Sequence, residues 1–274
     1  MPIRVGVQIQ PQHSTFAEMQ QAWRDAEELG VDSIYTWDHF YPLYGEPDGK
    51  HYEGVSSLTA LAASTKRVRV GALVFCNSYR NPQLLANVHT TIDQIAGGRV
   101  IFGIGAGWFE RDYDEYGYEF GTAPERLRAL GRDLPLIKDR LAKLNPAAVG
   151  PMPILIGGAG EKVTLRLVAE YADMWHAFGD TETYLAKSAI LAEHCAKIGK
   201  NPDEIERVWG SLSDIDKHAD GLAAAGVSEV TIGAGGGPNG YDLGPLRELV
   251  QWRDRHCASS CSGVTATTPH NRSR

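Results

Sequence analysis

The sequence contains no run of about 18 apolar residues, which is the length that a membrane-spanning helix needs. Its first residues, MPIRVGVQIQ, also lack the basic-then-apolar pattern of a secretory signal peptide. Lys and Arg number 27 against 34 Asp and Glu, which gives a formal net charge of -7. Nucleic acids and anionic membranes bind basic surfaces, so neither is an expected partner. We therefore expect a cytoplasmic protein that acts on a small molecule.

Familiar signatures of protein-borne chemistry are also missing. The four cysteines match neither a zinc motif nor a disulfide framework, and we expect reduced thiols and no bound metal. We find no carboxylate cluster with metal-ligand spacing and no nucleophile elbow with a Ser-His-Asp set. A chain without a strong nucleophile or a metal site relies on a bound cofactor for difficult chemistry.

Short β-rich runs alternate with amphipathic stretches along most of the chain. The expected strands are residues 4–9, 33–37, 68–75, 100–104, 154–156, 174–178, 207–211 and 229–232. Eight βα repeats predict a single-domain α/β fold, the (β/α)8 TIM barrel, which takes roughly 250 residues. The alternative is an open doubly wound sheet, but its G-x-G-x-x-G fingerprint does not follow the first strand.

The stretches between these strands carry helical signals. Thr15 and Glu18 have capping-box spacing before an amphipathic segment that Gly30 ends. Pro135 is expected to kink or break the helix predicted over 124–144. The remaining expected helices are residues 56–64, 82–95, 161–171, 183–198, 214–225 and 243–253. We assign residues 1–255 to the barrel domain and expect the Ser/Thr-rich segment 256–274 to be a disordered tail.

The active site of such a barrel lies at the carboxyl ends of its strands. Asp38 and His39 follow the second strand, where a polar pair needs a task or hydrogen-bond partners. An N-capping Asp beside a solvent-facing His is the alternative. After the third strand, Asn77 is expected at the barrel mouth, near the cofactor, together with Ser78, Tyr79 and Arg80. A plain loop that caps the next helix would explain them equally.

Glycines follow the fourth and fifth strands. The run Gly103, Gly105 and Gly107 permits close approach of a ligand to the backbone, or else relieves crowding inside the barrel. The turn at residues 157–160 precedes a helix whose N-terminus is a good phosphate site. A tight turn without a ligand is the alternative there.

Two more pairs follow strands at the same face of the barrel. We predict that Gln12 and His13, after the first strand, and Trp175 and His176, in the sixth, line the substrate pocket. His13 is equally explained as a polar loop residue, and Trp175 as packing against the barrel.

Together these segments resemble the luciferase-like monooxygenase superfamily, which holds FMN-dependent monooxygenases and oxidoreductases that use the deazaflavin coenzyme F420. The resemblance runs from residue 5 to about residue 253. The stretches that carry it are AEELGVDSIYTWDHF, the RNP of SYRNPQLLA, DQIAGGRVIFGIGAGW, PILIGGAGEKVTLRLVAEYADMW and AGVSEVTIG.

The resemblance implies a homodimer that holds its cofactor face-on at the barrel mouth. Asp38 is then expected at the edge of the cofactor ring, with His39, the expected catalytic residue, near the reactive carbon C5. The family also carries a non-proline cis peptide behind the ring, which falls here near Leu73–Val74. The residues expected to hold the ribityl and phosphate portions are Ala106, Gly107, Trp108, Gly157, Gly158, Ala159 and Gly160.

The resemblance predicts an F420-dependent oxidoreductase that transfers hydride between the deazaflavin and a small organic substrate. The alternatives are an FMN-dependent monooxygenase and a non-catalytic flavin-binding protein. Two departures from the family concern the substrate. Gln12 and Trp108 stand where the sugar-phosphate dehydrogenases of the family place carboxylates, and the segment between the fourth and fifth strands is short, which predicts an open pocket.

Overall fold

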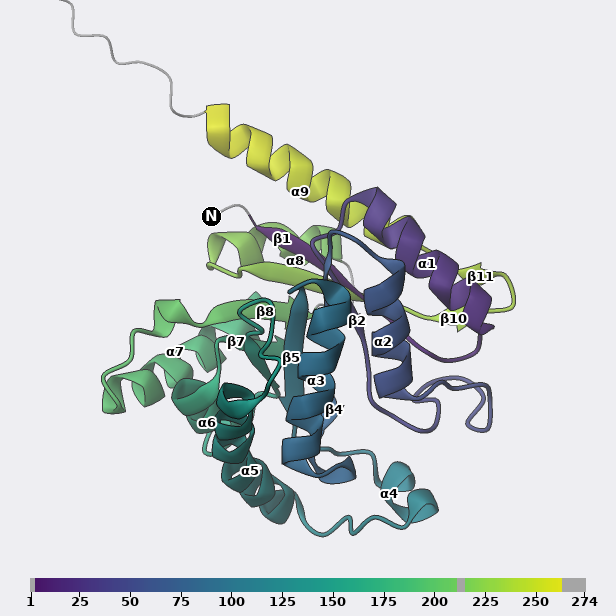
Figure 1. Cartoon of the computed structure of the whole chain (residues 1–274). Helices are drawn as coiled ribbons and strands as arrows, with labels where there is room; N and C mark the ends of the chain where they lie inside the picture. The colour runs from purple at the N-terminus through teal and green to yellow at the C-terminus, as the bar shows by residue number, and fades with distance from the viewer. Residues whose placement is uncertain (1–2, 211–214, 263–274) are drawn as a thin grey trace, which may run out of the picture.

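A computed structural model of the chain describes residues 3–210 and 215–262 (Figure 1). The strands of the main sheet are β1 (Arg4–Ile9), β2 (Ser33–Thr36), β3 (Arg69–Ala72), β4 (Phe75–Cys76), β5 (Val100–Gly105), β6 (Ile154–Gly157), β7 (Met174–Phe178), β8 (Glu206–Gly210) and β9 (Glu229–Ala234). The helices are α1 (Phe16–Leu29), α2 (Gly54–Ser64), α3 (Pro82–Ala96), α4 (Glu110–Tyr116), α5 (Ala123–Lys143), α6 (Thr164–Tyr171), α7 (Thr181–Lys197), α8 (Ile215–Ala224) and α9 (Gly244–Ser262). Two 3-10 turns, η1 (Asn77–Tyr79) and η2 (Pro202–Glu204), and a small hairpin of β10 (Gly236–Gly237) and β11 (Gly240–Tyr241) complete these elements.

The main sheet is a closed parallel barrel. Its strand order is β3-β2-β1-β9-β8-β7-β6-β5-β4, and the pairing of β3 with β5 closes the ring. Strands β3 and β4 share one position in this ring, interrupted at residues 73–74, so the barrel has eight strand positions. The predicted TIM barrel is therefore confirmed, and helices surround it (Figure 1).

Alternate side chains of each strand face opposite sides of the barrel wall. Tyr35, Ile101, Leu155, Met174 and Val208 form a small cluster inside the barrel. Their strand neighbours, such as Ile34 and Trp175, belong to the larger core between the strands and the helices. This alternation decides which strand residues can face a ligand in the barrel mouth.

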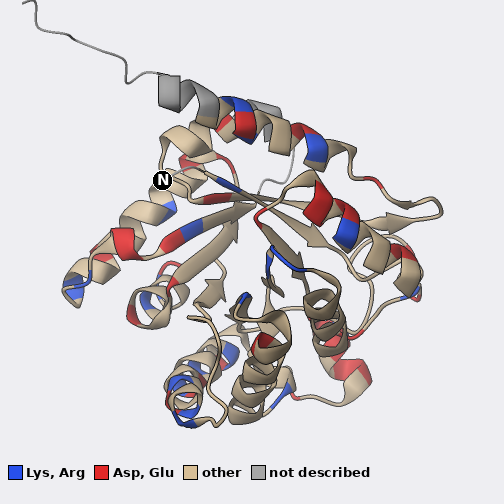
Figure 2. Ribbon diagram, turned by 45° about the horizontal axis from the view of Figure 1, so that its top comes forward, with Lys and Arg blue, Asp and Glu red and all other residues tan. Residues whose placement is uncertain are grey.

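Acidic and basic residues are spread over the outer helices (Figure 2).

Charged side chains fill the end of the barrel where the strands begin. Arg69 contacts the fully buried Glu229 at 2.5 Å and also pairs with Glu206 at 3.2 Å. Tyr35 donates a 2.8 Å hydrogen bond to the other oxygen of Glu229. Because burial of an unpaired charge is very unfavourable, these partners are what allows a carboxylate inside the barrel. They leave the opposite end for the site.

Two expectations about helices need correction, and one helix was not predicted. Pro135 does not break α5, which runs unbroken from Ala123 to Lys143 because buried side chains on both sides of the proline pack the helix onto the molecule. Helix α4 was not predicted. The last helix α9 continues to Ser262, so residues 256–262 are helical and not part of a disordered tail, and His256 stacks on Trp252 one turn earlier. The rest of the predicted tail, 263–274, lies outside the described residues.

Other local predictions agree with the structure. The capping box of Thr15 and Glu18 is present at the start of α1, and Gly30 ends that helix in the left-handed conformation. The helix predicted from residue 161 begins at Thr164, after a turn. Within residues 3–210 and 215–262, no helix combines the length and apolar content required to cross a bilayer.

Candidate active site

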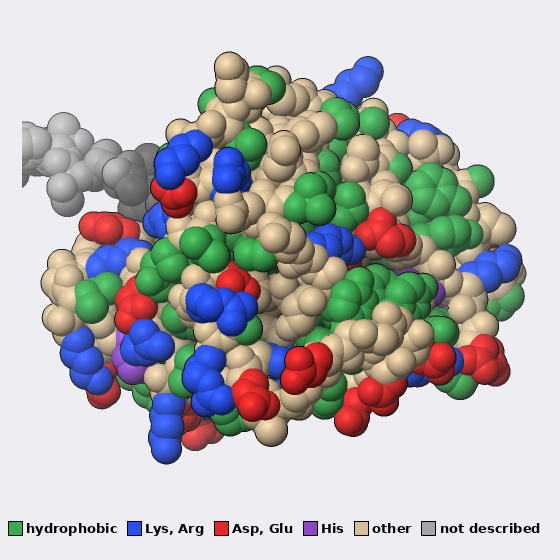
Figure 3. All heavy atoms as spheres, turned by 60° about the horizontal axis from the view of Figure 1, so that its bottom comes forward, with side chains coloured by type: hydrophobic (Ala, Val, Ile, Leu, Met, Phe, Trp, Pro, Cys, Tyr) green, Lys and Arg blue, Asp and Glu red, His purple; other side chains and the backbone are tan. Residues whose placement is uncertain are grey.

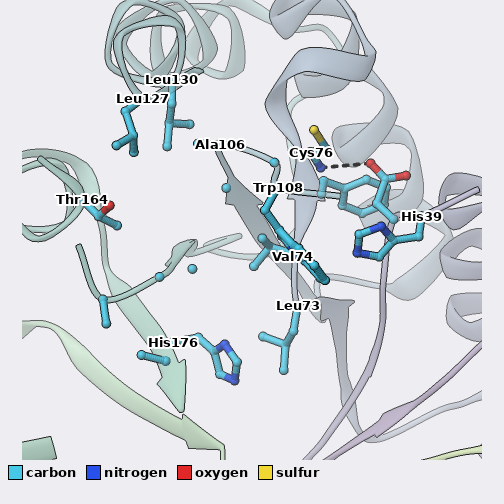
Figure 4. A pocket seen from close by; sticks show the side chains of 18 of the residues that line it. His39, Leu73, Val74, Cys76, Ala106, Trp108, Leu127, Leu130, Thr164 and His176 are labelled. Atoms are coloured by element: carbon cyan, nitrogen blue, oxygen red, sulfur yellow. Dashed lines mark hydrogen bonds between the residues drawn. The ribbon is translucent and has the colours of Figure 1, made fainter. Parts of the chain in front are cut away.

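A cavity of about 450 Å³ opens at the carboxyl ends of the barrel strands. Its walls come from the interruption between β3 and β4, the loops after β2, β5 and β6, the end of β7, and helix α5. Figure 4 shows His39 on one side, Thr164 on the other, and Leu127 and Leu130 above. Within the described residues, no Lys or Arg lines this cavity. On the lower face of Figure 1, groups of hydrophobic side chains lie between acidic and basic ones (Figure 3).

An apolar bulge at Leu73 and Val74 forms one wall of the cavity. The bond between them is a cis peptide, at the position that the resemblance predicts. Gln8 inside the barrel donates a 2.9 Å hydrogen bond to the Leu73 carbonyl. A Cβ atom at Gly105 or Gly157 would come within 2.7 or 2.9 Å of the Val74 methyl groups. The glycines of β5 and β6 therefore make room for the bulge, as the crowding alternative predicted for Gly105.

Gly107 has a different reason for lacking a side chain. Its φ is +80°, and a Cβ would lie 2.1 Å from the Tyr113 hydroxyl and 2.6 Å from the Cys76 sulfur. Arg126 donates a 3.1 Å hydrogen bond to the Gly107 carbonyl and fixes this loop against α5. The next residue, Trp108, lines the cavity with 64% of its surface exposed.

Asp38 lines the cavity, but its oxygens are engaged inside the protein. Arg80 donates to both of them, at 2.6 and 2.9 Å, and the Cys76 N–H donates at 3.0 Å (Figure 4). Burial raises the pKa of the Asp38 carboxyl, while Arg80 and the Cys76 N–H act in the opposite direction. Burial also raises the pKa of the Cys76 thiol to about 11, which keeps it from acting as a nucleophile. Contact between Asp38 and a cofactor ring stays a prediction.

His39 also lines the cavity, and its Nδ1 lies 2.7 Å from the carboxylate of Asp112. The rings of Trp108 and Phe109 meet its ring at steep angles, with centroids 5.8 and 5.5 Å away. Sequence reasoning missed Asp112, which comes from the unpredicted helix α4. Its only signal was an acidic residue next to Tyr113 on what proves to be the buried face of a seven-residue helix.

His176 and Trp175 are separated by the barrel wall. His176 faces the cavity, and its buried Nε2 has no partner among the described residues. Burial lowers the pKa of His176 to about 3, so its imidazole is neutral at ordinary pH. Trp175 faces outward, where it donates a 2.8 Å hydrogen bond to the Gly158 carbonyl and packs on Trp209. Trp175 therefore packs behind the glycine turn. The prediction that it lines the substrate pocket is wrong, because its side chain lies on the outer side of the barrel wall.

Three other predicted residues lie off the cavity wall. Gln12 accepts a hydrogen bond from the Leu43 N–H at 2.9 Å, and His13 lies 2.6 Å from the Tyr44 carbonyl. Both side chains hold the loop that precedes α2, which explains why they do not line the cavity. The side chain of Asn77 is buried, and its Nδ2 donates a 2.8 Å hydrogen bond to Asp133. Its Oδ1 has no partner in the described part of the chain.

The glycine turn after β6 reaches the cavity with most of its residues. Gly157, Gly158 and Ala159 line it together with Thr164, the first residue of α6, while Gly160 does not. Within the part of the chain that the structure describes, no side chain caps the N-terminus of α6, while the Leu165 N–H donates a 3.0 Å hydrogen bond to the Gly160 carbonyl. Uncapped N–H groups and the positive end of the helix dipole attract anions. Binding of a phosphate at this turn stays a prediction.

A protein-family model matches residues 1–220 of the sequence. That family is described as luciferase-like monooxygenase. The match covers most of the chain, and the protein therefore belongs to the luciferase-like monooxygenase family, as the quoted sequence stretches indicated.

Two curated enzymes show how similar the sequence is to known proteins, and one of them is named as F420-dependent. The chain is 30% identical over 251 residues to a 5,10-methylenetetrahydromethanopterin reductase of Archaeoglobus fulgidus, covering 86% of this chain and 71% of that one. It is also 30% identical over 165 residues to an F420-dependent glucose-6-phosphate dehydrogenase of Amycolatopsis mediterranei, covering 54% of this chain. The matched segment spans only 47% of that dehydrogenase, about half of its length.

Solved structures support the same fold. An F420-dependent secondary alcohol dehydrogenase in complex with an F420-acetone adduct superposes with a TM-score of 0.76 at 17% identity. This superposition covers 88% of the present chain and 95% of the other. The F420-dependent tetrahydromethanopterin reductase of Methanopyrus kandleri superposes with a TM-score of 0.72, also at 17% identity, over 93% and 99% of the two chains.

Proposed function

We propose that the protein is an F420-dependent oxidoreductase that transfers hydride between the deazaflavin and a small organic substrate. The observation that carries the proposal is the placement of His39 and the Leu73–Val74 bulge on one cavity at the barrel mouth. The F420-dependent glucose-6-phosphate dehydrogenases among the relatives favour this cofactor over FMN. When bound, the deazaflavin supplies the carbon that accepts or releases the hydride.

The residues on the cavity wall fit a flat, phosphate-bearing cofactor. Leu73 and Val74 offer an apolar surface to one ring face. The buried Nε2 of His176, which has no partner among the described residues, can pair with a polar atom at the edge of the ring. Because no Lys or Arg lines the described wall, we assign the phosphate to the backbone N–H groups of residues 157–160 and the start of α6.

Parallel fluorescence titrations with F420 and FMN test this assignment. We expect a dissociation constant in the micromolar range or tighter for F420 and much weaker binding of FMN. In Ala159→Trp, a bulky ring on the cavity wall should abolish binding. The matched Ala147→Trp places the same ring on an exposed loop and should bind as the wild type does.

The outcomes of the titration separate the possible functions. Preference for FMN would move the protein to the flavin-dependent monooxygenases. Tight F420 binding without turnover on any alcohol, ketone or imine substrate would indicate a non-catalytic carrier. Binding of neither cofactor would refute the proposal.

We further propose that the protein is a homodimer. One chain has a mass of 29.9 kDa, so light scattering coupled to size-exclusion chromatography should give about twice that mass.

A further inference from the structure

Asp112 is a buried carboxylate surrounded by three hydrogen-bond donors and by Nδ1 of His39. Its Oδ1 accepts the backbone N–H groups of Phe40 and Tyr41, at 3.0 and 3.2 Å. Its Oδ2 accepts the Tyr79 hydroxyl at 3.0 Å and lies 2.7 Å from Nδ1 of His39. The side chain of Asp112 has no solvent exposure. The loop after β2, the η1 turn and helix α4 thus converge on one carboxylate.

This arrangement selects one form of the His39 ring. An ionised carboxylate can only accept hydrogen bonds, and a neutral imidazole carries its hydrogen on either Nδ1 or Nε2. A hydrogen on Nδ1 completes the 2.7 Å contact with Asp112, whereas a hydrogen on Nε2 would place two lone pairs against each other. The Nδ1–H form is therefore the one that this pocket accommodates.

The second nitrogen of His39 remains available to a ligand. Nε2 has no hydrogen-bond partner within the described part of the chain, and the ring lines the cavity. Edge contacts with Trp37, Trp108 and Phe109 hold the ring in place, at centroid distances of 5.5 to 5.8 Å. In the neutral ring, a hydrogen on Nδ1 leaves the lone pair on Nε2, which is then the nitrogen available to a ligand.

We propose that Asp112 is a positioning residue that holds His39 in the Nδ1–H form and makes Nε2 a hydrogen-bond acceptor for a ligand hydroxyl. The role assigned to the hydroxyl rests on the proposed function, since it places an alcohol substrate against His39. The state of the ring rests only on the contacts of Asp112. The two parts are therefore tested by different measurements.

The state of the ring is measured by two-bond ¹H–¹⁵N correlation spectra of protein labelled with ¹⁵N-histidine, without cofactor, at a pH where the spectra themselves show a neutral ring. His39→Gln identifies the His39 signals. We expect the Nδ1–H pattern in the wild type and its loss in Asp112→Asn. The amide oxygen of the new side chain can keep accepting the Phe40 and Tyr41 N–H groups, which turns its NH2 group toward Nδ1 of His39. Asp114→Asn makes the same change at an exposed position of α4 and should keep the wild-type pattern.

A Tyr79→Phe variant guards against misfolding of Asp112→Asn. It removes one donor from Asp112 but keeps the carboxylate, so the Nδ1–H pattern should persist if Asp112 sets it. An Nε2–H pattern in the wild type, or an unchanged pattern in a folded Asp112→Asn, overturns the proposal.

Kinetics test the ligand contact. Asp112→Asn should lower kcat by about 10²- to 10⁴-fold, the usual contribution of a positioned acid or base, with the F420 dissociation constant within about twofold of wild type. Asp114→Asn should leave both unchanged. An unchanged kcat in Asp112→Asn refutes the contact between Nε2 and the substrate hydroxyl. Absence of F420 binding in the wild type instead refutes the proposed function and leaves the spectroscopic result to decide the role of Asp112.

Discussion

Arg80 donates to both carboxylate oxygens of Asp38, at 2.6 and 2.9 Å, and thereby ties the loop after β4 to the end of β2. The same guanidinium contacts Glu53, which caps the N-terminus of α2. One cation thus joins three segments beside the cavity. Its removal leaves the buried Asp38 without its counter-ion.

We expect Arg80→Ala to lower the free energy of unfolding by about 3–5 kcal/mol at pH 7, the loss typical of breaking a buried ion pair. Arg132→Ala is the matched control, because Arg132 also contacts an aspartate but is 70% exposed, and its loss should be about 0–1 kcal/mol.

Burial raises the pKa of Asp38, so this carboxyl favours the folded state at low pH and loses that contribution as the pH rises through its folded pKa. The Arg80→Ala defect should therefore shrink on acidification. Equal defects in the two variants would contradict the structural role of Arg80.

Two glycines with similar backbone angles have different surroundings. Gly107 and Gly117 have φ values of +80° and +71°, but of the two only Gly107 would place a Cβ against other side chains, those of Tyr113 and Cys76. Both alanine variants should lose about 1–2 kcal/mol from the left-handed backbone. Gly107→Ala should lose measurably more and also weaken cofactor binding, since the loop carries Trp108 into the cavity. Urea unfolding compares the two, and indistinguishable losses would show that the contact with Tyr113 is easily relieved.

His176 separates binding from stability. Its buried Nε2 has no partner among the described residues, so His176→Leu removes an unsatisfied polar atom and should leave the melting temperature unchanged or higher. The same variant should bind F420 about two- to tenfold more weakly, which is the effect of losing one ordinary hydrogen bond. Unchanged affinity would place the cofactor away from β7.

Two buried histidines, His89 and His176, and the half-buried His51 predict acid sensitivity. Burial is the main cause that lowers the pKa of His51 to about 4, of His89 to about 4 and of His176 to about 3. The unfolded chain takes up these protons near pH 6.5, whereas the folded chain does so only near pH 4 or below. Stability is therefore fully present above about pH 6.5 and is lost as the pH falls toward 4.

The His89→Leu variant isolates one of these contributions. At about 1.4 kcal/mol for each pKa unit, His89 accounts for about 3 kcal/mol of the loss between pH 6.5 and 4. Urea unfolding at several pH values should show a flatter dependence in His89→Leu. Asn87→Gln, an exposed change on the same helix, should keep the wild-type dependence. A wild-type slope in His89→Leu would falsify the assignment.

Local sequence patterns were sufficient for the barrel and for several of the cavity residues. Alternating apolar runs define strands whose carboxyl ends meet at one face, so the sequence predicted His39 and the turn after β6 at the barrel mouth. His39 lines the cavity there, as do Gly157, Gly158 and Ala159 of the turn. The register within a strand was harder to predict. Trp175 and His176 are neighbours in sequence, but the alternation of β7 puts one in the outer core and the other in the cavity.

The sequence by itself determined the repeated βα order, the closed parallel sheet and the family, because these follow from local periodicity and contiguous motifs. Only the tertiary structure decided which polar side chains meet. Asp112 reaches His39 across 73 residues of chain, and Arg80 reaches Asp38 across 42. Such contacts depend on the packing of α4 and η1 against the loop after β2, and no short-range pattern encodes that distance. The partner of each polar group at this site was therefore set by how the loops fold over the barrel mouth.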